Sequence, residues 1–220
     1  MIYPEQSENL EQLFKKYPEK LIDFLHSCNE SQWSSKLWIM KELNPYLSKF
    51  GKQGSYKIAV LGGWYGLLSY VMIKELRVKI KQIDSFDIDS MTSKIGKIFN
   101  KDVVNYYIKD VAEINFGNTY DIIINTSSEH MVQETINHTI DSSDSGTIFV
   151  LENNDFRQFG EIYGGDKVLD HINCSDSKEE FANKYRQYFN EFVTFTKPWK
   201  SSNGPLGNNY DRYLGIGIKK

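Results

Sequence analysis

The chain has 220 residues, which is enough for one well-buried domain and a small appendage. Its 40% hydrophobic and 25% charged residues are typical of an ordinary globular protein, and its net charge of −3 argues against a surface built for bulk nucleic-acid binding. No apolar run is long enough to span a membrane. Two widely separated cysteines, Cys28 and Cys174, and an acidic start without targeting features predict free thiols in a cytoplasmic protein.

Residues 7 to about 43 are predicted to form helices. Apolar residues recur at helical spacing in three runs, of which the first ends at Pro18 and the third at Asn44-Pro45. Gly51 and Gly54 then mark a change of pattern. We therefore predict an N-terminal helical cap over residues 1–50 and a second domain over residues 51–220.

The second domain alternates short apolar strands with amphipathic helices, a pattern that predicts a parallel sheet covered on both faces. The expected strands are 57–61, 78–89, 103–110, 120–126 and 146–153, and the expected helices are 66–77, 90–100 and 130–140.

The C-terminal part begins with a polar loop over residues 154–174, whose Gly160, Gly164 and Gly165 suit either a lid or an ordinary surface loop. Ser177 and Glu180 form a capping box for a helix that reaches about residue 189. Two further strands, 191–199 and 210–218, flank a turn-rich connection and predict an antiparallel hairpin.

A glycine-rich turn joins the first strand of this domain to its first helix. Gly62, Gly63 and Gly66 would let the backbone approach a ligand there, although a tight packing turn is the alternative. The spacing matches neither the dinucleotide fingerprint nor a phosphate loop, and Trp64 and Tyr65 would crowd a pyrophosphate.

An acidic residue is expected about 20 residues after such a turn, where it binds ribose hydroxyls. Asp87 lies 21 residues after Gly66 at the end of the second strand, whereas Asp89 better suits the N-cap of the next helix. The alternative for Asp87 is a solvated strand end. The turn and the acid together predict a site for a nucleoside without phosphates.

The ordered set of motifs resembles the class I S-adenosylmethionine-dependent methyltransferases over about residues 50 to 220. The motifs are VLGGWYG (60–66), SFDID (85–89), YYIKD (106–110) and YDIIINTSSEHM (120–131), followed by the terminal hairpin. The resemblance implies an α/β Rossmann-like methyltransferase sheet, mostly parallel with a C-terminal antiparallel hairpin. It implies S-adenosylmethionine as cofactor, bound by Gly62, Gly63, Trp64, Gly66, Asp87 and, on the adenine side, Asp110.

Two positions depart from the family pattern. Val60 stands where the family usually has an acid, and Trp64 replaces the usual middle glycine. These departures leave open a non-catalytic binding or scaffold protein on the same fold. Another enzyme that uses S-adenosylmethionine, by cleaving it or by transferring its aminocarboxypropyl group, is also open. The sequence is further similar to phage-encoded proteins with the same crowded turn.

The resemblance places the transferred group near the end of the fourth motif. His130 is our candidate base, because histidine is the side chain best suited to accept a proton near neutral pH, with Asn125 and Glu129 as orienting residues. The alternative is that Ser127 or Ser128 caps the following helix.

Metal binding is not predicted, because the four histidines are scattered and His130 and His138 lie eight residues apart, not four. No motif identifies the methyl acceptor, which could be a small molecule, a nucleoside or a nucleic acid, and no oligomeric state is indicated. Lys197, Trp199 and Arg212 suggest either a small basic-aromatic patch for a nucleic-acid strand or a solvated hairpin tip.

Overall fold

The structure is a computed structural model that describes residues 7–101, 103–155, 171–200 and 209–220. The chain forms two compact units, Met1–Asp110 and Val111–Lys220, and each is described by itself. The glycines of the loop expected to be either a lid or an ordinary surface loop, Gly160, Gly164 and Gly165, lie outside the described residues. No helix in the described ranges is both long enough and apolar enough to cross a membrane.

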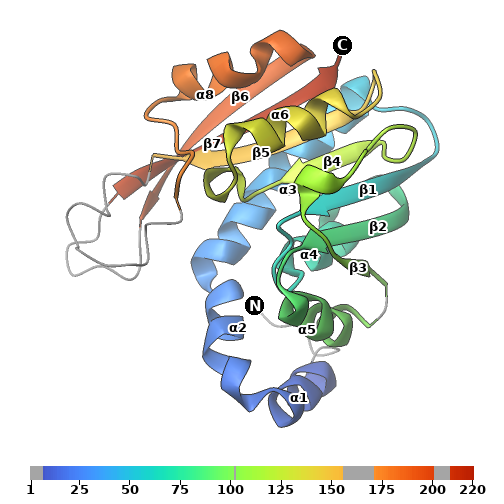
Figure 1. The fold of residues 1–220 in the computed structure, drawn as a ribbon, viewed down its shortest axis with the longest axis vertical. Coiled ribbons are helices and arrows are strands. Elements are labelled where there is room, and N and C mark those ends of the chain that lie inside the picture. Colours follow the sequence, from blue (N-terminus) through green and yellow to red (C-terminus); the bar gives the residue numbers. More distant parts are fainter. Residues whose placement is uncertain (1–6, 102, 156–170, 201–208) are drawn as a thin grey trace. The chain divides into compact units, whose positions relative to one another are not determined.

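The first unit begins with a layer of helices (Figure 1). These are α1 (Ser7–Lys16), the short 3-10 helix η2 (Pro18–Lys20), α2 (Leu21–Ser27) and α3 (Glu30–Phe50). The first helix ends before Pro18, as predicted. The boundary between a cap and a second domain stays a prediction.

The third helix does not stop at Asn44-Pro45, so that prediction was wrong. Pro45 lies inside α3, where it removes the hydrogen bond to the carbonyl of Lys41. Both residues are exposed, so water can satisfy that carbonyl. Beyond the proline, Tyr46 and Leu47 are buried. Their burial offsets the cost of the missing hydrogen bond, and the helix continues to Phe50.

The rest of the first unit is a parallel β/α alternation (Figure 1). Its elements are β1 (Ser55–Leu61), α4 (Leu67–Glu75), β2 (Lys79–Asp87), α5 (Ser90–Asn100) and β3 (Asn105–Ile108). The strand order is β3-β2-β1, and both pairings are parallel. The last residue of β1, Leu61, lies opposite Phe86. The turn that follows β1 therefore begins beside the acidic end of β2.

An aromatic cluster joins the N-terminal helices α1 and α2 to the glycine turn and to helices α4 and α5. Its buried members are Leu10, Leu13, Phe24, Tyr65, Tyr70, Ile95 and Phe99. The ring centroids of Phe24 and Phe99 are 5.3 Å apart in an edge-on arrangement. The cluster contains a residue of the glycine turn, Tyr65, so burial of the helices also fixes the turn.

The second unit contains the antiparallel hairpin (Figure 1). Its elements are η3 (Val111–Glu113), β4 (Ile122–Asn125), η4 (Ser128–His130), α6 (Gln133–Asp141), β5 (Ile148–Asn154), α8 (Lys178–Tyr185), η6 (Arg186–Tyr188), β6 (Phe189–Lys200) and β7 (Asn209–Lys219). Strands β4 and β5 are parallel, whereas β7 runs antiparallel to both β5 and β6. The predicted α/β class, mostly parallel with a C-terminal hairpin, is confirmed.

Two helix boundaries in this unit differ from the sequence prediction. The helix expected over 130–140 begins only at Gln133, because η4 occupies Ser128–His130. The helix capped by Ser177 ends at Tyr185, followed by the single turn η6. The Ser177 hydroxyl accepts the Glu180 N–H at 3.1 Å, as the capping box predicts, but the Glu180 carboxylate accepts from Asp176, one residue before the cap.

Candidate functional site

The glycine turn is tied to the end of β2 through its backbone. The N–H groups of Gly62 and Gly63 donate to the carbonyl of Phe86 at 2.9 and 3.3 Å. The N–H of Trp64 donates to the Asp87 carboxylate at 3.0 Å. The turn and the acid that the sequence paired 21 residues apart are therefore in direct contact.

Packing explains why two of the turn residues are glycines. Gly66 has φ 87° as the N-cap of α4, and a Cβ there would overlap the hydroxyl of Tyr106. Asn100 Nδ2 secures this arrangement by donating to the Gly66 carbonyl at 3.1 Å and to the Tyr106 hydroxyl at 2.6 Å. A Cβ on Gly63 would overlap the Ser85 hydroxyl. Close packing therefore requires glycine at both Gly63 and Gly66, independently of any ligand.

Asp87 is a partly buried carboxylate with both oxygens oriented. Oδ2 accepts from Trp64, and Oδ1 accepts from the N–H of Asp89 at 3.0 Å. Burial raises the pKa of Asp87 above its ordinary value, while these backbone donors oppose the shift. Asp89 itself caps α5 by accepting the Met91 N–H at 2.8 Å, which confirms the role predicted for it.

Two residues that neighbour Asp87 along the backbone, Ile88 and Ile108, are apolar and exposed. Ile88 is 75% exposed and Ile108 is 53% exposed, and Ile108 is the register partner of Asp87 in the β2–β3 pairing. The N–H of Lys109 donates to the Asp87 carbonyl at 3.0 Å, which holds the chain at the end of β3 against β2. Asp110 follows and is exposed. The sequence analysis did not predict either isoleucine as part of the site, although each lies within one of the four motifs.

The aromatic residues of the turn pack against the N-terminal helices. Tyr65 is buried, and its hydroxyl donates to the Asp23 carboxylate. The Trp64 ring stacks on Tyr65 with centroids 5.7 Å apart and is partly buried against the aromatic cluster. The large side chains of Trp64 and Tyr65 therefore pack against residues of the same unit. A contact between Trp64 and a cofactor stays a prediction.

The second unit holds the residues predicted on the acceptor side. Asn125 is buried at the end of β4, where its Oδ1 accepts the Ser127 N–H at 2.9 Å and its Nδ2 lies 3.3 Å from the Met131 sulfur. These contacts make Asn125 a turn-forming residue. Neither serine caps the helix: Ser127 makes no capping bond, and the Ser128 hydroxyl donates to the carbonyl of Glu152.

Glu129 and His130 are the two ionisable residues of this segment. Glu129 is 7% exposed, and its Oε1 accepts from Asn154 Nδ2 at 2.9 Å. Burial raises the pKa of Glu129, and the nearby His130 opposes that shift. His130 Nε2 lies 3.9 Å from Glu129 Oε1, and the side chain of His130 is 38% exposed.

His171 is a third member of this group that the sequence did not reveal. Its ring meets the His130 ring edge-on with centroids 4.5 Å apart. The histidine that was compared with His130, His138, instead has its Nε2 3.1 Å from the carbonyl of Ile114. Spacing along one helix could not find His171, because it comes from a different segment of the chain.

Two residues of the supposed basic-aromatic patch, Trp199 and Arg212, are buried. Arg212 is 8% exposed, and its Nη1 donates to Glu152 Oε1 at 2.9 Å. Its guanidinium also lies over the Trp199 ring, 5.1 Å from the centroid, and Trp199 is buried. Trp199 and Arg212 therefore form neither an exposed nucleic-acid patch nor a solvated hairpin tip.

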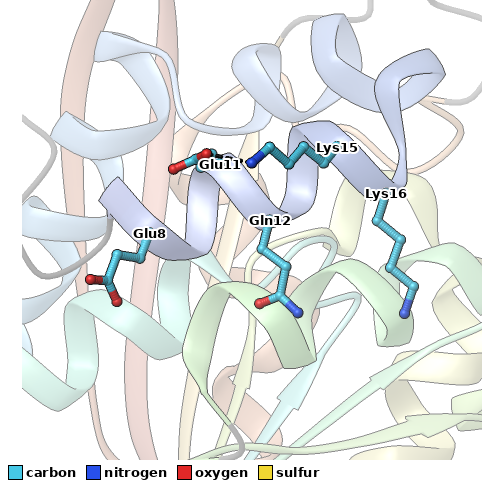
Figure 2. Close-up of a pocket in the computed structure, with 5 residues that line it drawn as sticks. All are labelled: Glu8, Glu11, Gln12, Lys15 and Lys16. Carbon is cyan, nitrogen blue, oxygen red and sulfur yellow. Dashed lines mark hydrogen bonds and ion pairs between the residues drawn. The ribbon is translucent and has the colours of Figure 1, made fainter.

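A hollow on the exposed face of α1 does not resemble a ligand site. It is lined by Glu8, Glu11, Gln12, Lys15 and Lys16, and Figure 2 shows the ion pair in which Lys15 Nζ lies 2.5 Å from Glu11 Oε1. All five are charged or amide side chains of one helix. None belongs to the predicted site.

No protein-family model and no curated protein sequence matches the chain. Solved structures do. A methyltransferase-like protein (BH2331) from Bacillus halodurans C-125 is 12% identical with TM-score 0.59, over 82% of this chain and 99% of that chain. The plantazolicin methyltransferase BpumL, in complex with SAH, is 13% identical with TM-score 0.61, over 97% and 100%. The CurJ carbon methyltransferase is 14% identical with TM-score 0.63, over 99% and 72%. The chain therefore has the class I methyltransferase fold that its motifs predicted.

Proposed function

We propose that this protein is a methyltransferase that uses S-adenosylmethionine. The observation that carries the proposal is the arrangement around Asp87. An oriented carboxylate at the carboxyl end of β2 has an exposed apolar residue next to it in the chain, Ile88, and another opposite it on β3, Ile108. The carboxylate suits a ribose diol and the apolar surfaces suit a purine ring, so the set matches adenosine.

The solved structures support the same cofactor. BpumL was crystallised with SAH, S-adenosylhomocysteine, which is what S-adenosylmethionine becomes after it gives up its methyl group. In our proposal the adenosine binds at Asp87 with Asp110 on the adenine side, and the methionine part binds near Gly62, Gly63, Trp64 and Gly66.

The chemical step requires little covalent chemistry from the protein. Methyl transfer is an in-line displacement at a sulfonium carbon, so positioning of the acceptor supplies much of the rate. Where the acceptor carries a proton, His130 is the proposed proton acceptor and Glu129 its orienting partner, 3.9 Å away. Asn125 supports them indirectly by fixing the turn after β4.

A matched pair of substitutions tests the adenosine site. Ile108→Ser removes an apolar contact beside Asp87, whereas Val103→Ser removes a similarly exposed one, at 61%, before the start of β3. Loss of the burial of most of one aliphatic side chain is worth about 1.5 kcal/mol, which is roughly tenfold in affinity. We expect Ile108→Ser to weaken S-adenosylmethionine binding by about that factor in isothermal titration, and Val103→Ser to leave it unchanged. Equal effects of the two would remove the basis for the site.

The pH dependence of binding gives an independent check. Burial raises the pKa of Asp87 in the free protein, and hydrogen bonds from a ribose would stabilise its charged form. Affinity should therefore be complete at neutral pH and fall as the pH drops through that raised pKa. An Asp87→Asn variant should lose this acidic limb, and a parent affinity that stays constant from neutral to acidic pH would contradict the assignment.

Two rival functions remain, each with an observation in its favour. Val60 is fully buried in β1 and supplies no carboxylate for the methionine end, which favours a binding or scaffold protein. That reading predicts no turnover with any acceptor. A different enzyme acting on S-adenosylmethionine would release methylthioadenosine or another fragment instead of S-adenosylhomocysteine, so mass spectrometry of the nucleoside product separates the two chemistries.

Several expectations stay predictions under this proposal. The acceptor could be a small molecule, a nucleoside or a nucleic acid, and neither the net charge nor the buried Arg212 favours a nucleic-acid strand. The cytoplasmic location, the phage-encoded origin and the division into a cap over 1–50 and a domain over 51–220 are also predictions.

A further inference from the structure

One carboxylate and two imidazoles meet in the second unit. Glu129, His130 and His171 each offer a ligand atom, and these atoms all lie within 4.8 Å of one another. Across the described ranges, this is the one group of three or more such side chains with that spacing. Two of the four histidines of the chain, His26 and His138, lie elsewhere.

Backbone hydrogen bonds hold together the segments of the chain that carry these three side chains. Glu129 and His130 are successive residues of η4. The segment after His171 is fixed to them, because the N–H of Asn173 donates to the Glu129 carbonyl at 3.0 Å and the N–H of Ser175 donates to the Asn154 carbonyl at 3.1 Å. The backbone arrangement is thus built into the fold, with Glu129 buried, His171 half-buried and His130 exposed.

The Glu129 carboxylate points to a missing ligand. The residue is 7% exposed, and Asn154 satisfies its Oε1 at 2.9 Å. Its Oε2 is buried and has no hydrogen-bond partner in the described part of the chain. A buried carboxylate oxygen without a partner is costly, so such an atom calls for a cation or a donor.

We propose that Glu129, His130 and His171 bind one divalent transition-metal ion. Two imidazoles and one carboxylate form a donor set suited to Zn²⁺, Fe²⁺, Co²⁺ or Ni²⁺, whereas Mg²⁺ and Ca²⁺ prefer oxygen ligands throughout. Three protein ligands leave at least one coordination position for water or substrate, as in catalytic zinc sites.

The geometry requires the ligand atoms, which lie within 4.8 Å of one another, to move closer by up to about 1.4 Å. His130 Nε2 and Glu129 Oε1 are 3.9 Å apart, and ligand atoms about 2.0–2.1 Å from a tetrahedral metal are about 3.4 Å apart. Neighbouring groups are placed to orient the ligands: Asn154 holds Glu129, and the Cys174 sulfur lies 3.9 Å from His171 Nδ1. Such outer contacts commonly fix the ring orientation of metal-bound histidines.

The inference goes beyond the proposed methyltransferase function and does not rest on it. A metal-bound His130 cannot also accept a proton. In the metal-bound protein the ion would instead bind the acceptor atom, or a water molecule, and lower its pKa, and the released proton would pass to solvent. Metal binding and S-adenosylmethionine binding are measured separately, so either idea can fail while the other stands.

Cobalt titration of the full chain tests the site directly. The protein, without an affinity tag, is stripped with EDTA, dialysed and titrated with Co²⁺, whose visible absorption reports coordination by nitrogen ligands, and Zn²⁺ is then added in competition. We expect one equivalent of Co²⁺, displaced by one equivalent of Zn²⁺. His171→Ala and Glu129→Gln should each weaken binding by more than about tenfold, since even loss of outer-shell contacts has that effect.

The remaining histidines supply the matched control. The double variant His26→Ala/His138→Ala removes two exposed imidazoles that lie outside the cluster. It should bind Co²⁺ as tightly as the parent. Glu129→Gln preserves side-chain size, so it guards against a loss caused by unfolding, and circular dichroism confirms the fold of each variant. A parent that binds neither Co²⁺ nor Zn²⁺ would overturn the proposal, as would a control double variant that loses as much affinity as His171→Ala.

Discussion

Tyr65 links the glycine turn to the N-terminal helices, and replacing it measures how firmly the two are joined. The side chain is buried, its ring centroid lies 6.0 Å from that of Phe24, and its hydroxyl donates to the Asp23 carboxylate. Tyr65→Phe removes the hydrogen bond and keeps the ring. Tyr65→Ala removes both.

The expected magnitudes follow from these contacts. A hydrogen bond to a charged group contributes about 1.5–3 kcal/mol to stability. Asp23 is only partly buried, so water can replace the hydroxyl, and we expect a loss of about 1.5 kcal/mol for Tyr65→Phe, at the low end of that range. Loss of a buried aromatic ring costs about 3–5 kcal/mol, so Tyr65→Ala should be at least twice as destabilising.

Urea unfolding followed by tryptophan fluorescence measures both losses, because the Trp64 ring stacks on Tyr65. Tyr107→Phe is the matched control, since that tyrosine is 39% exposed and its replacement should change the free energy of unfolding by less than about 0.5 kcal/mol. The reasoning is refuted if Tyr65→Ala costs less than about 1 kcal/mol, or if the control costs as much as Tyr65→Phe.

Three further predictions concern other parts of the structure. Gly66→Ala should lower the free energy of unfolding in urea by about 3 kcal/mol, because the added Cβ would overlap the Tyr106 hydroxyl. Gly146→Ala, with φ 90° and open space around it, should cost only about 1–2 kcal/mol, and equal losses would disprove the overlap at Gly66. Burial raises the pKa of Cys28 to about 11, so iodoacetamide should label it roughly 100 times more slowly than a thiol of pKa 9.0, and rapid labelling in a peptide map would refute this. Arg212→Met should cost about 3–5 kcal/mol by stranding the charge of Glu152, and adding Glu152→Gln should restore much of it; a harmless single variant would show that the pair is not needed.

Local patterns were sufficient to predict most elements of the fold. The helix expected over 90–100 has those bounds in the structure, because Asp89 supplies a side-chain cap and the apolar spacing continues to Asn100. The strand at 57–61 was identified by its continuous apolar run, and β1 is indeed buried from Ile58 to Leu61. Both signals lie within a few residues of the feature they determine.

Boundaries that depend on distant contacts could not be predicted. Pro45 normally ends a helix, but α3 continues because Tyr46 and Leu47 are buried beyond it. The sequence contains no sign of that burial. The start of α6 at Gln133 was missed for a similar reason, since the Ser128 hydroxyl bonds to Glu152 on β5 and not to the helix.

The candidate site shows the same division. Asp87 could be identified because its distance from the glycine turn is set by one β/α/β unit, and the structure places it in contact with Trp64. His171 could not be identified from the sequence, because it follows His130 by some forty residues and the two rings come into contact only in the folded chain. The bulk of Trp64 and Tyr65 was correctly noticed, but its partner, the N-terminal helical layer, lies outside the motif.

Isothermal titration with S-adenosylmethionine and S-adenosylhomocysteine, using NAD and ATP as controls, tests the central claim most directly. We expect the first two alone to bind, with dissociation constants on the order of micromolar. Asp87→Ala removes the carboxylate that would accept two ribose hydroxyls at about 1.5 kcal/mol each, so its affinity should fall by about 100-fold. If the parent binds neither nucleoside, or if Asp87→Ala binds as tightly as the parent, the chain has the methyltransferase fold without the cofactor site assigned to it.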